Sequence, residues 1–411
     1  MEIEDWRLKD KLNIALLGTA YPYRGGLAAF NERLARQFMA EGHDVQIFTF
    51  TMQYPDFLFP GKTQYSDSPA PKDLKITRTM NSIAPWSWWK TARLLKKAKI
   101  DVLVIKFWIP LMAPCLGTIA RLARRQGIQV VSVLDNVIPH EPHFWDKWLI
   151  RYFIRSVDRF VAMSESVRQD CLKFLPDRPR QSRSKSKDRY AQRQKTDLVT
   201  LSPHPLYDNF GEAVEKSAAR KELDLPEDKT ILLFFGFIRD YKGLDVLMRA
   251  YTEAIETKDE RQKTKDKLLL VVAGEFYNNG EQYKQLEQEL GLEGTIAWHT
   301  DFIPDERVRL YFSAADLIVQ PYKTATQSGV TQIAYHFERP MLVTNVGGLA
   351  EIVPNGKVGY VCPVDEHAIA EALVQFAEMP AEEREKQFGE NIKKEKQKYA
   401  WSVMTRAILQ L

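Results

Sequence analysis

The feature of this chain that most limits its fold is a regular alternation of short apolar runs with amphipathic stretches. The apolar runs lie at 13–18, 44–50, 101–107, 130–134, 159–163, 231–237, 268–274, 295–299, 316–321, 341–346 and 359–363. Stretches between them, such as 27–41, 88–98 and 112–126, show helical periodicity. Near-continuous apolar runs are typical of buried strands in parallel sheets. The alternation therefore predicts an α/β fold, and 411 residues are enough for two parallel sheets.

The domain boundary is expected near 202–215, where Pro203 and Pro205 interrupt the pattern. We expect an N-terminal domain over 1–203, a second domain over 204–385 and a C-terminal helical segment over 386–411. An apolar stripe in this last segment predicts a helix that packs back on the first domain. The stripe consists of Trp401, Val403, Met404, Ile408 and Leu409.

The basic character of the chain comes from one segment. The net charge is +4, but residues 178–195 hold eight Lys/Arg and one Asp, so the remainder is net −3. This distribution argues against nucleic-acid binding by the rest of the chain. The segment is expected to be a mobile, solvated insertion. A contact with anionic lipid or an acidic partner is the alternative.

Cysteine content and hydropathy indicate the compartment. Cys115, Cys171 and Cys362 give neither a disulfide framework nor a metal-ligand spacing. The first residues lack an apolar signal region, and no run reaches the roughly 18 apolar residues of a membrane span. We therefore expect a cytoplasmic protein.

The run at 231–237 leads directly into a candidate anion site. Gly236 ends the run, and Arg239 and Lys242 follow where open α/β sheets bind ligands. Further on, the residues Ser328–Val330 open a predicted helix, whose free N–H groups favour anions. Two cations and a helix N-terminus together predict a diphosphate site, and so an enzyme that handles a nucleotide-linked group.

Several blocks of the sequence match a known family. They are Gly25-Gly26 after the first run, GFIRDYKG (236–243), VVAGEF (271–276) and the long block 315–353. With these blocks the chain resembles retaining glycosyltransferases of family 4, which have the GT-B fold. The resemblance covers nearly the whole length. It implies two facing Rossmann-like domains, with the nucleotide sugar mainly on the second, the acceptor mainly on the first and the chemistry in the cleft.

The resemblance also implies roles for individual residues. Arg239, Lys242 and His140 are the expected catalytic residues, and Asn136 and Arg24 are expected in the sugar or acceptor pocket. The donor is expected to contact Gly25, Gly26, Gly236, Glu275, Gln327, Ser328, Gly329, Val330 and Gln332. A nucleotide-diphosphate sugar is the implied co-substrate, and no further cofactor is expected. Plain structural readings stay open for several of them: a strand-to-helix turn for the glycine pair, a capping role for Glu275 and an exposed position for Gln332.

The sequence departs from the family pattern at the nucleotide site. Ala325 and Ile333 occupy the positions of the usual glutamate pair, and Ile333 cannot accept a hydrogen bond from a ribose. Gln332 or Gln327 could replace that contact. Phe237 stands where the family often has its arginine, and Asp135 stands where it has a histidine. No Asp-x-Asp triplet occurs, so we expect no metal, and stabilisation of the leaving diphosphate by fixed cations and backbone amides.

The predicted function is transfer of a sugar, with retention and without a metal, to a saccharide, lipid-linked or small-molecule acceptor. A non-catalytic sugar-nucleotide-binding or partner subunit is the alternative, and an epimerase or phosphorylase on the same fold is another. The stretch 83–99 combines Trp86, Trp88 and Trp89 with basic residues, which suits a lipid interface at the inner face of a membrane. A packed helix with a solvated basic face is the plainer structural reading of the same stretch. Neither the sugar, the base, the acceptor nor the oligomeric state follows from the sequence.

Overall fold

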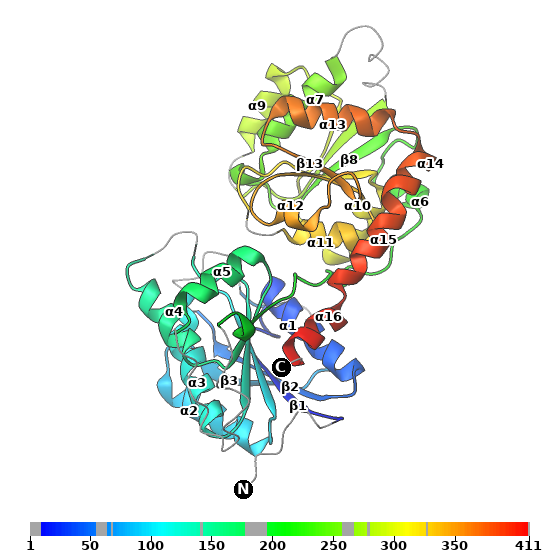
Figure 1. Ribbon diagram of the computed structural model, residues 1–411. Helices are drawn as coiled ribbons and strands as arrows, with labels where there is room; N and C mark the ends of the chain where they lie inside the picture. The colour runs from blue at the N-terminus through cyan, green and yellow to red at the C-terminus, as the bar shows by residue number, and fades with distance from the viewer. Residues whose placement is uncertain are drawn as a thin grey trace. The chain divides into compact units, whose positions relative to one another are not determined.

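The computed structural model describes residues 10–54, 64–66, 69–139, 143–176, 195–256, 267–277, 280–325 and 328–409. The chain forms two compact units, Met1–His204 with Trp401–Leu411 (unit 1) and Pro205–Ala400 (unit 2) (Figure 1). Each unit is built on its own parallel sheet covered by helices. The predicted α/β class with two Rossmann-like domains is confirmed.

Unit 1 contains a seven-stranded parallel sheet in the order β3-β2-β1-β4-β5-β6-β7. Its strands are β1 (Asn13–Leu17), β2 (Asp44–Met52), β3 (Ile76–Asn81), β4 (Val102–Phe107), β5 (Gln129–Leu134), β6 (Arg159–Ala162) and β7 (Val199–Leu201). The chain moves outward from β1 in one direction and then from β4 in the other. The loops that follow β1 and β4 therefore diverge at a topological switch point, where such sheets bind ligands.

Helices cover both faces of this sheet. They are α1 (Gly26–Ala40), α2 (Pro85–Lys97), α3 (Ala113–Arg125), α4 (Asp146–Ile154), α5 (Glu165–Phe174) and α16 (Trp401–Leu409), with 3₁₀ turns at Pro110–Met112 and Lys195–Leu198. Strand β4 is buried throughout, and its side chains alternate between two cores. Val102 and Val104 pack in the core that contains α1 and α16, whereas Leu103 and Ile105 pack in the core that contains α2, α3 and α4.

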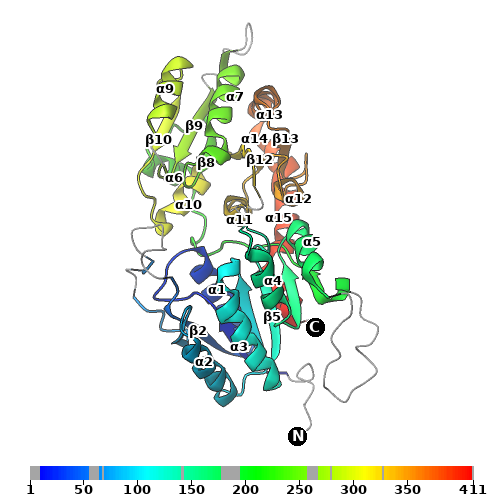
Figure 2. The ribbon, with the colours of Figure 1, turned by 90° about the vertical axis from the view of Figure 1, so that its left-hand side faces the viewer.

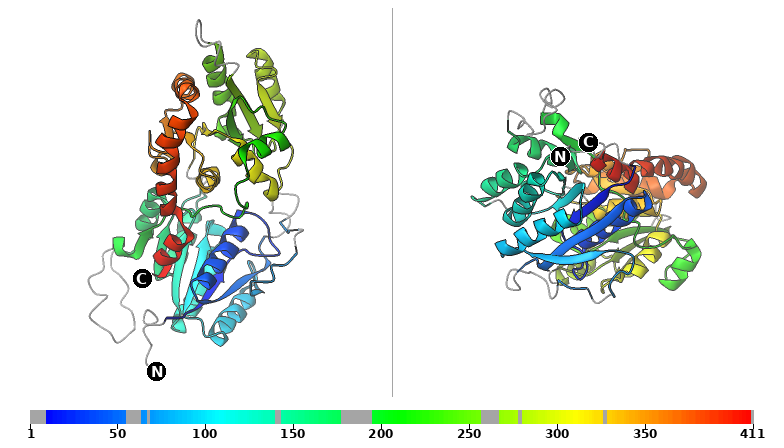
Figure 3. Two further views of the ribbon diagram at one scale, coloured as in Figure 1. Left: turned by 90° about the vertical axis from the view of Figure 1, so that its right-hand side faces the viewer. Right: turned by 90° about the horizontal axis from the view of Figure 1, so that it is seen from below.

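The last helix completes unit 1. Trp401, Met404 and Ile408 of α16 are buried in the core beneath α1, and the ring centroids of Trp401 and Phe30 are 5.1 Å apart. Figure 3 shows α16 beside α1, over the same face of the sheet. The expected stripe thus packs on the N-terminal domain, as one apolar face of a helix must.

The predicted C-terminal segment is too long. Residues 386–400 belong to unit 2, because Phe388 and Ile392 are fully buried in its core. The other boundary lies between His204 and Pro205, one residue from the predicted position. The many charged residues of 386–400 predict a separate segment. The few apolar residues that join it to the core of unit 2 do not form a pattern that the sequence alone would assign to that core.

Unit 2 contains a six-stranded parallel sheet in the order β10-β9-β8-β11-β12-β13. Its strands are β8 (Thr230–Phe235), β9 (Leu268–Ala273), β10 (Ile296–His299), β11 (Leu317–Gln320), β12 (Met341–Thr344) and β13 (Gly359–Cys362). Its α-helices are α6 (Lys216–Glu222), α7 (Leu244–Glu256), α9 (Glu281–Glu289), α10 (Asp305–Ala314), α11 (Gly329–His336), α12 (Leu349–Ile352), α13 (Glu366–Glu378), α14 (Ala381–Arg384) and α15 (Glu390–Lys396). Single turns lie at Asp240–Lys242, Glu385–Gly389 and Gln397–Tyr399. Here the switch point lies between β8 and β11.

All eleven predicted strands are present, within two residues of their expected ends. Two further strands, β3 and β7, escaped prediction. β3 lies at one edge of the sheet and reads ITRTMN, and β7 lies at the other edge and has only three residues. β3 is half-buried and contains polar residues, and β7 is short, so neither gives a continuous apolar run. In the described part of the chain, no helix combines the length and apolar character needed to cross a bilayer.

Candidate functional site

The predicted anion site is assembled at the switch point of unit 2. The loop after β8 carries Gly236 and Arg239, and the 3₁₀ turn Asp240–Lys242 follows. Helix α11 begins after the neighbouring strand β11. A Cβ atom placed on Gly236 would lie 3.0 Å from the Nζ of Lys242 and 3.9 Å from the Cγ2 of Val330. The ammonium of Lys242 and the first turn of α11 therefore meet at the end of β8.

Glycine is required at two points of this loop. Gly236 has φ 93° and lies so close to Gly274, at the end of β9, that a Cβ on Gly274 would be 2.6 Å from the carbonyl oxygen of Gly236. Gly243 has φ 69°, and a Cβ there would be 2.0 Å from the carbonyl oxygen of Pro321. These close approaches fix the course of the loop against β9 and β11.

Both predicted cations lack an acidic partner within the described residues. Lys242 is buried, and burial together with the charge of Arg239 lowers the pKa of its ammonium to about 8. The exposed guanidinium of Arg239 lies 3.9 Å from the ring centroid of Tyr277. A buried ammonium without a counter-ion is unfavourable unless a ligand supplies the negative charge.

The acidic residues next to these cations are already paired with another lysine. Lys323 Nζ lies 2.8 Å from a carboxylate oxygen of Asp240 and 2.9 Å from one of Asp245. The backbone N–H of Lys323 also donates to the carbonyl of Tyr241 at 2.7 Å. Lys323 therefore links the loop after β11 to the loop after β8, and it pairs with the two carboxylates nearest in sequence to Lys242. The sequence analysis did not identify this residue.

A buried tyrosine contacts the N-cap residue of α11. Ser328 is the N-cap residue, and its hydroxyl makes no capping hydrogen bond to the helix. Instead its Oγ lies 3.3 Å from the hydroxyl of the buried Tyr322. Burial raises the pKa of Tyr322 well above its usual value, so this phenol stays neutral. The first N–H groups of the helix, at Gly329 and Val330, are thus left without a side-chain acceptor from the N-cap.

Two glutamines, one on α11 and one at the end of β11, are buried without full hydrogen bonding. Neither amide atom of Gln332 has a partner in the described structure, although the side chain is only 1% exposed. Gln320 accepts from the hydroxyl of Thr331 at 3.2 Å, and its own Nε2 has no partner within the same residues. Leaving a buried amide without hydrogen bonds costs free energy. The surroundings of Gln332 therefore indicate a place where a polar ligand would supply the missing hydrogen bonds.

The other predicted donor residues of unit 2 have mixed surroundings. Ile333 is buried among apolar side chains, which excludes a polar role for it. Ala325 is half-buried. The backbone carbonyl of Glu275 accepts from the N–H of Ile238 at 2.8 Å, and its half-buried carboxylate forms no ion pair with a described residue. Glu275 therefore lies beside the loop that carries Arg239.

In unit 1, the predicted glycine turn follows β1. Gly25 is the N-cap of α1 with φ 99°, and Gly26 is the first residue of the helix. The backbone N–H of the exposed Arg24 donates to the carbonyl of Gln64 at 3.1 Å. A Cβ on Gly25 would meet nothing within 4 Å, so only its backbone conformation and an approaching ligand would call for glycine here.

A buried ion pair supports the loop that carries Asn136. Lys106 on β4 is 3% exposed, and its Nζ lies 2.9 Å from the carboxylate of Asp135 and 3.2 Å from the ring centroid of Phe30. Burial lowers the pKa of Lys106, and Asp135 opposes that shift. Asp135 is thus engaged by a lysine, and the half-buried Asn136 follows it directly. The position where the family has a histidine is therefore part of a structural pair in this chain.

Some predictions fall outside the described residues. They concern His140, Gln327 and almost all of the basic segment 178–195. Within the described residues, no group of three or more His, Cys, Asp or Glu side chains could hold a metal ion.

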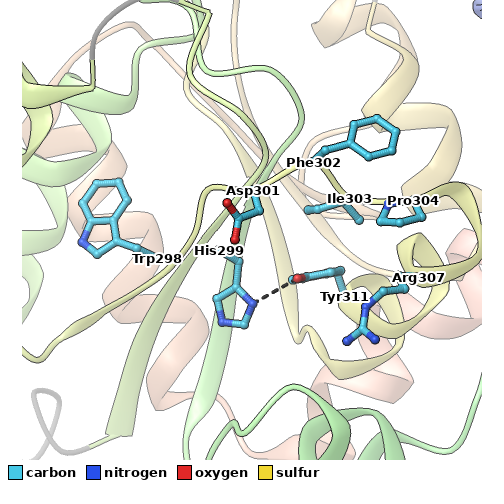
Figure 4. Close-up of a pocket in the computed structure, with 8 residues that line it drawn as sticks. All are labelled: Trp298, His299, Asp301, Phe302, Ile303, Pro304, Arg307 and Tyr311. Carbon is cyan, nitrogen blue, oxygen red and sulfur yellow. Dashed lines mark hydrogen bonds between the residues drawn. The ribbon is translucent and has the colours of Figure 1, made fainter.

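A pocket of about 320 Å³ opens at the carboxyl end of β10 (Figure 4). Its lining residues are Trp298, His299, Asp301, Phe302, Ile303, Pro304, Arg307 and Tyr311. The Nδ1 of His299 lies 3.0 Å from the hydroxyl of Tyr311, and burial, with the charge of Arg307, lowers the pKa of the imidazole. Because β10, β9 and β8 are neighbours, the pocket opens at the same edge of the sheet as the loop with Lys242.

The chain is similar to known proteins in both sequence and fold. A family model described as "Glycosyl transferases group 1" matches residues 215–395, and one described as "Glycosyltransferase Family 4" matches residues 24–181. A D-inositol 3-phosphate glycosyltransferase of Streptomyces avermitilis is 30% identical over 198 residues, which are 47% of this chain and 42% of the relative. The match thus spans less than half the length of that relative.

Two further similarities extend over nearly the whole chain. The N-acetyl-alpha-D-glucosaminyl L-malate synthase of Bacillus anthracis is 23% identical over 398 residues, covering 92% of this chain and 91% of the relative. The crystal structure of Anabaena Alr3699/HepE in complex with UDP has a TM-score of 0.67 at 14% identity, covering 97% of this chain and 99% of that one. This second similarity shows the fold. With one family model on each unit, the chain belongs to glycosyltransferase family 4 and has the GT-B fold.

Proposed function

We propose that this protein transfers a sugar from a nucleotide-diphosphate donor to an acceptor, with retention of anomeric configuration and without a metal ion. One observation carries the proposal: Lys242, a buried ammonium with no described acidic partner, lies at the end of β8 beside the start of α11. A diphosphate at this point would supply the missing negative charge.

The chemistry follows from the charge that develops when the donor breaks. Cleavage of the bond between the anomeric carbon and the diphosphate oxygen leaves negative charge on the diphosphate. Lys242, Arg239 and the N–H groups at the start of α11 would stabilise that charge at fixed positions. The absence of an Asp-x-Asp triplet supports stabilisation without a metal. Family membership supports retention: we propose that the leaving diphosphate takes the acceptor proton on the face from which it departs.

Gln332 is the residue we propose for contact with the nucleotide ribose. Its buried amide has no described partner, and it precedes Ile333, which stands where the family has a glutamate. An amide both donates and accepts hydrogen bonds, so it suits a pair of hydroxyl groups.

The donor and acceptor are best identified by direct trial. The Anabaena protein was crystallised with UDP, so UDP and its sugars come first, followed by GDP, ADP and dTDP derivatives. The names of the relatives point to phosphorylated inositol and L-malate as first acceptors, and lipid-linked saccharides should follow. Thermal stabilisation of the protein by each nucleotide identifies the base.

The decisive experiment is stereochemical. With an α-linked donor, proton NMR of the product should show an α-linkage, and turnover should persist in EDTA. Lys242→Met should reduce turnover at least about a hundredfold, whereas Lys221→Met, at an exposed position on α6, should not. A β-linked product would refute retention, and activity lost in EDTA but restored by a divalent cation would refute metal independence.

The missing glutamate pair favours a second candidate, a sugar-nucleotide-binding subunit without activity. Ile333 is buried in the core and Ala325 cannot form a hydrogen bond through its side chain. Stabilisation by a nucleotide without turnover of any donor and acceptor pair would support this candidate over the transferase.

A further inference from the structure

Unit 1 exposes an unusual group of large apolar side chains where three of its helices begin. They are Ile83, Trp86, Trp89, Leu111, Phe144, Trp145 and Trp148, which we call the apolar rim. Phe144 is 90% exposed, Trp148 77% and Trp86 76%. Single exposed apolar residues are normal, but seven at one end of a helical layer indicate a contact surface.

The topology of unit 1 brings the rim together. Helices α2, α3 and α4 follow strands β3, β4 and β5, so each begins at the carboxyl edge of the parallel sheet. They lie side by side on one face of the sheet (Figure 2). Every member of the rim lies in the first turns of these helices or just before them. The rim therefore forms a line across the ends of three adjacent helices.

The same three helices carry a strong positive charge. Together α2, α3 and α4 contain nine Lys/Arg and a single acidic residue, Asp146, which is buried. Four of these cations, Lys90, Arg93, Lys147 and Arg151, are exposed and lie within about two helical turns of the rim, whereas the other five lie toward the C-terminal ends of α2 and α3. Arg93 follows Trp89 by one helical turn on α2, and Arg151 follows Trp148 in the same way on α4. Both arginines are exposed, and neither has a carboxylate partner among the described residues.

We propose that this surface binds an anionic phospholipid bilayer. Aromatic side chains are favoured at the boundary between headgroups and acyl chains, and cations a few ångströms behind them meet the phosphates. The charge decides between a bilayer and a second copy of the chain. Two copies facing each other through this surface would bring like charges together, whereas an anionic bilayer neutralises them.

The proposal does not depend on transferase activity and can be tested with the purified full chain. Sedimentation with phosphatidylcholine vesicles that contain 0 to about 40% phosphatidylglycerol measures the partition coefficient. Binding should rise steeply with the anionic fraction and weaken as salt is raised from about 0.05 to 0.5 M. The fluorescence of the rim tryptophans should shift to shorter wavelengths on binding.

Two double variants separate the contribution of the aromatic side chains to vesicle binding from that of the cations. Trp86→Gln with Trp148→Gln should reduce partition about tenfold or more. Arg93→Gln with Arg151→Gln should reduce it about twenty-five-fold, since each charge contributes about fivefold. Met39→Gln, an exposed apolar position on α1 over the other face, and Lys72→Gln, before the start of β3, are the matched controls. Unchanged circular dichroism and thermal melting confirm that the variants are folded.

Each outcome bears on the proposal. Loss of binding in both paired variants, with the controls unchanged, supports it. Equal binding to neutral and anionic vesicles, or equal losses in the controls, overturns it. A dimer in solution that dissociates in the tryptophan variant, with no vesicle binding by the original chain, also overturns it and assigns the rim to self-association.

Discussion

Replacing the buried Lys242 with methionine should make the ligand-free protein more stable while it weakens nucleotide binding. Methionine keeps the unbranched stem and removes the ammonium. The pKa of Lys242 falls from an ordinary 10.5 to about 8 because the charged form is buried. A difference of roughly 2.5 pKa units corresponds to about 3 kcal/mol of destabilisation whenever the lysine is protonated in both the folded and the unfolded state.

The pH dependence has a defined direction. Below about pH 8 the lysine is charged in both states, so the folded protein carries the full penalty. Between about pH 8 and 10.5 the unfolded chain binds the proton more tightly than the folded one, so the stability of the original protein rises with pH. The advantage of Lys242→Met should therefore be largest near pH 7 and should shrink steadily as the pH approaches 10.

Denaturant unfolding followed by circular dichroism, from pH 7 to 9.5, measures the stability difference. Isothermal titration with the preferred nucleoside diphosphate measures the binding. A diphosphate favours the charged lysine, so affinity for the original protein should fall as the pH rises above about 8, with uptake of protons on binding. The reasoning is refuted if Lys242→Met is less stable than the original at pH 7 and binds the nucleotide equally well.

Three further predictions concern other contacts described above. Gly243→Ala should destabilise unit 2 by about 3 kcal/mol or more, because its Cβ would lie 2.0 Å from a backbone carbonyl oxygen, whereas Gly291→Ala, with a similar φ and open space, should lose only about 1 kcal/mol; denaturant unfolding compares the two. Asp135→Asn should lose about 3–5 kcal/mol by leaving the buried Lys106 without a counter-ion, and adding Lys106→Met to it should restore most of that stability, as thermal melts would show. Gln332→Leu should stabilise the ligand-free chain by about 1–3 kcal/mol and weaken binding of the nucleoside more than binding of inorganic diphosphate; equal losses for both ligands would argue against contact with the ribose.

Much of the fold was predictable because the strands of a parallel sheet are buried on both faces. The predicted runs are mostly apolar, as in β4 and β9, where every residue is buried. The predictions failed where burial is one-sided. The edge strand β3 presents polar residues to solvent, and residues 386–400 join the core of unit 2 through a few anchors such as Phe388.

In the candidate site, too, the residues set by a local stretch of sequence were predictable and the contacts between distant residues were not. Gly236, Arg239 and Lys242 could be proposed from the sequence because one strand and its loop place them within seven residues of one another. The supporting contacts could not. Lys323 pairs with Asp240 across 83 residues, and Lys106 pairs with Asp135 from a neighbouring strand.

By itself, the sequence determined the class of fold and the loop that carries the anion-binding charges, since both depend on local patterns of apolar, glycine and basic residues. Only the tertiary structure decided which charges remain free. Lys242 faces no described acidic partner because Lys323, supplied by the next strand of the sheet, engages Asp240 and Asp245. The charge at a site is a sum over side chains that folding brings together, and most of those neighbours are distant along the chain.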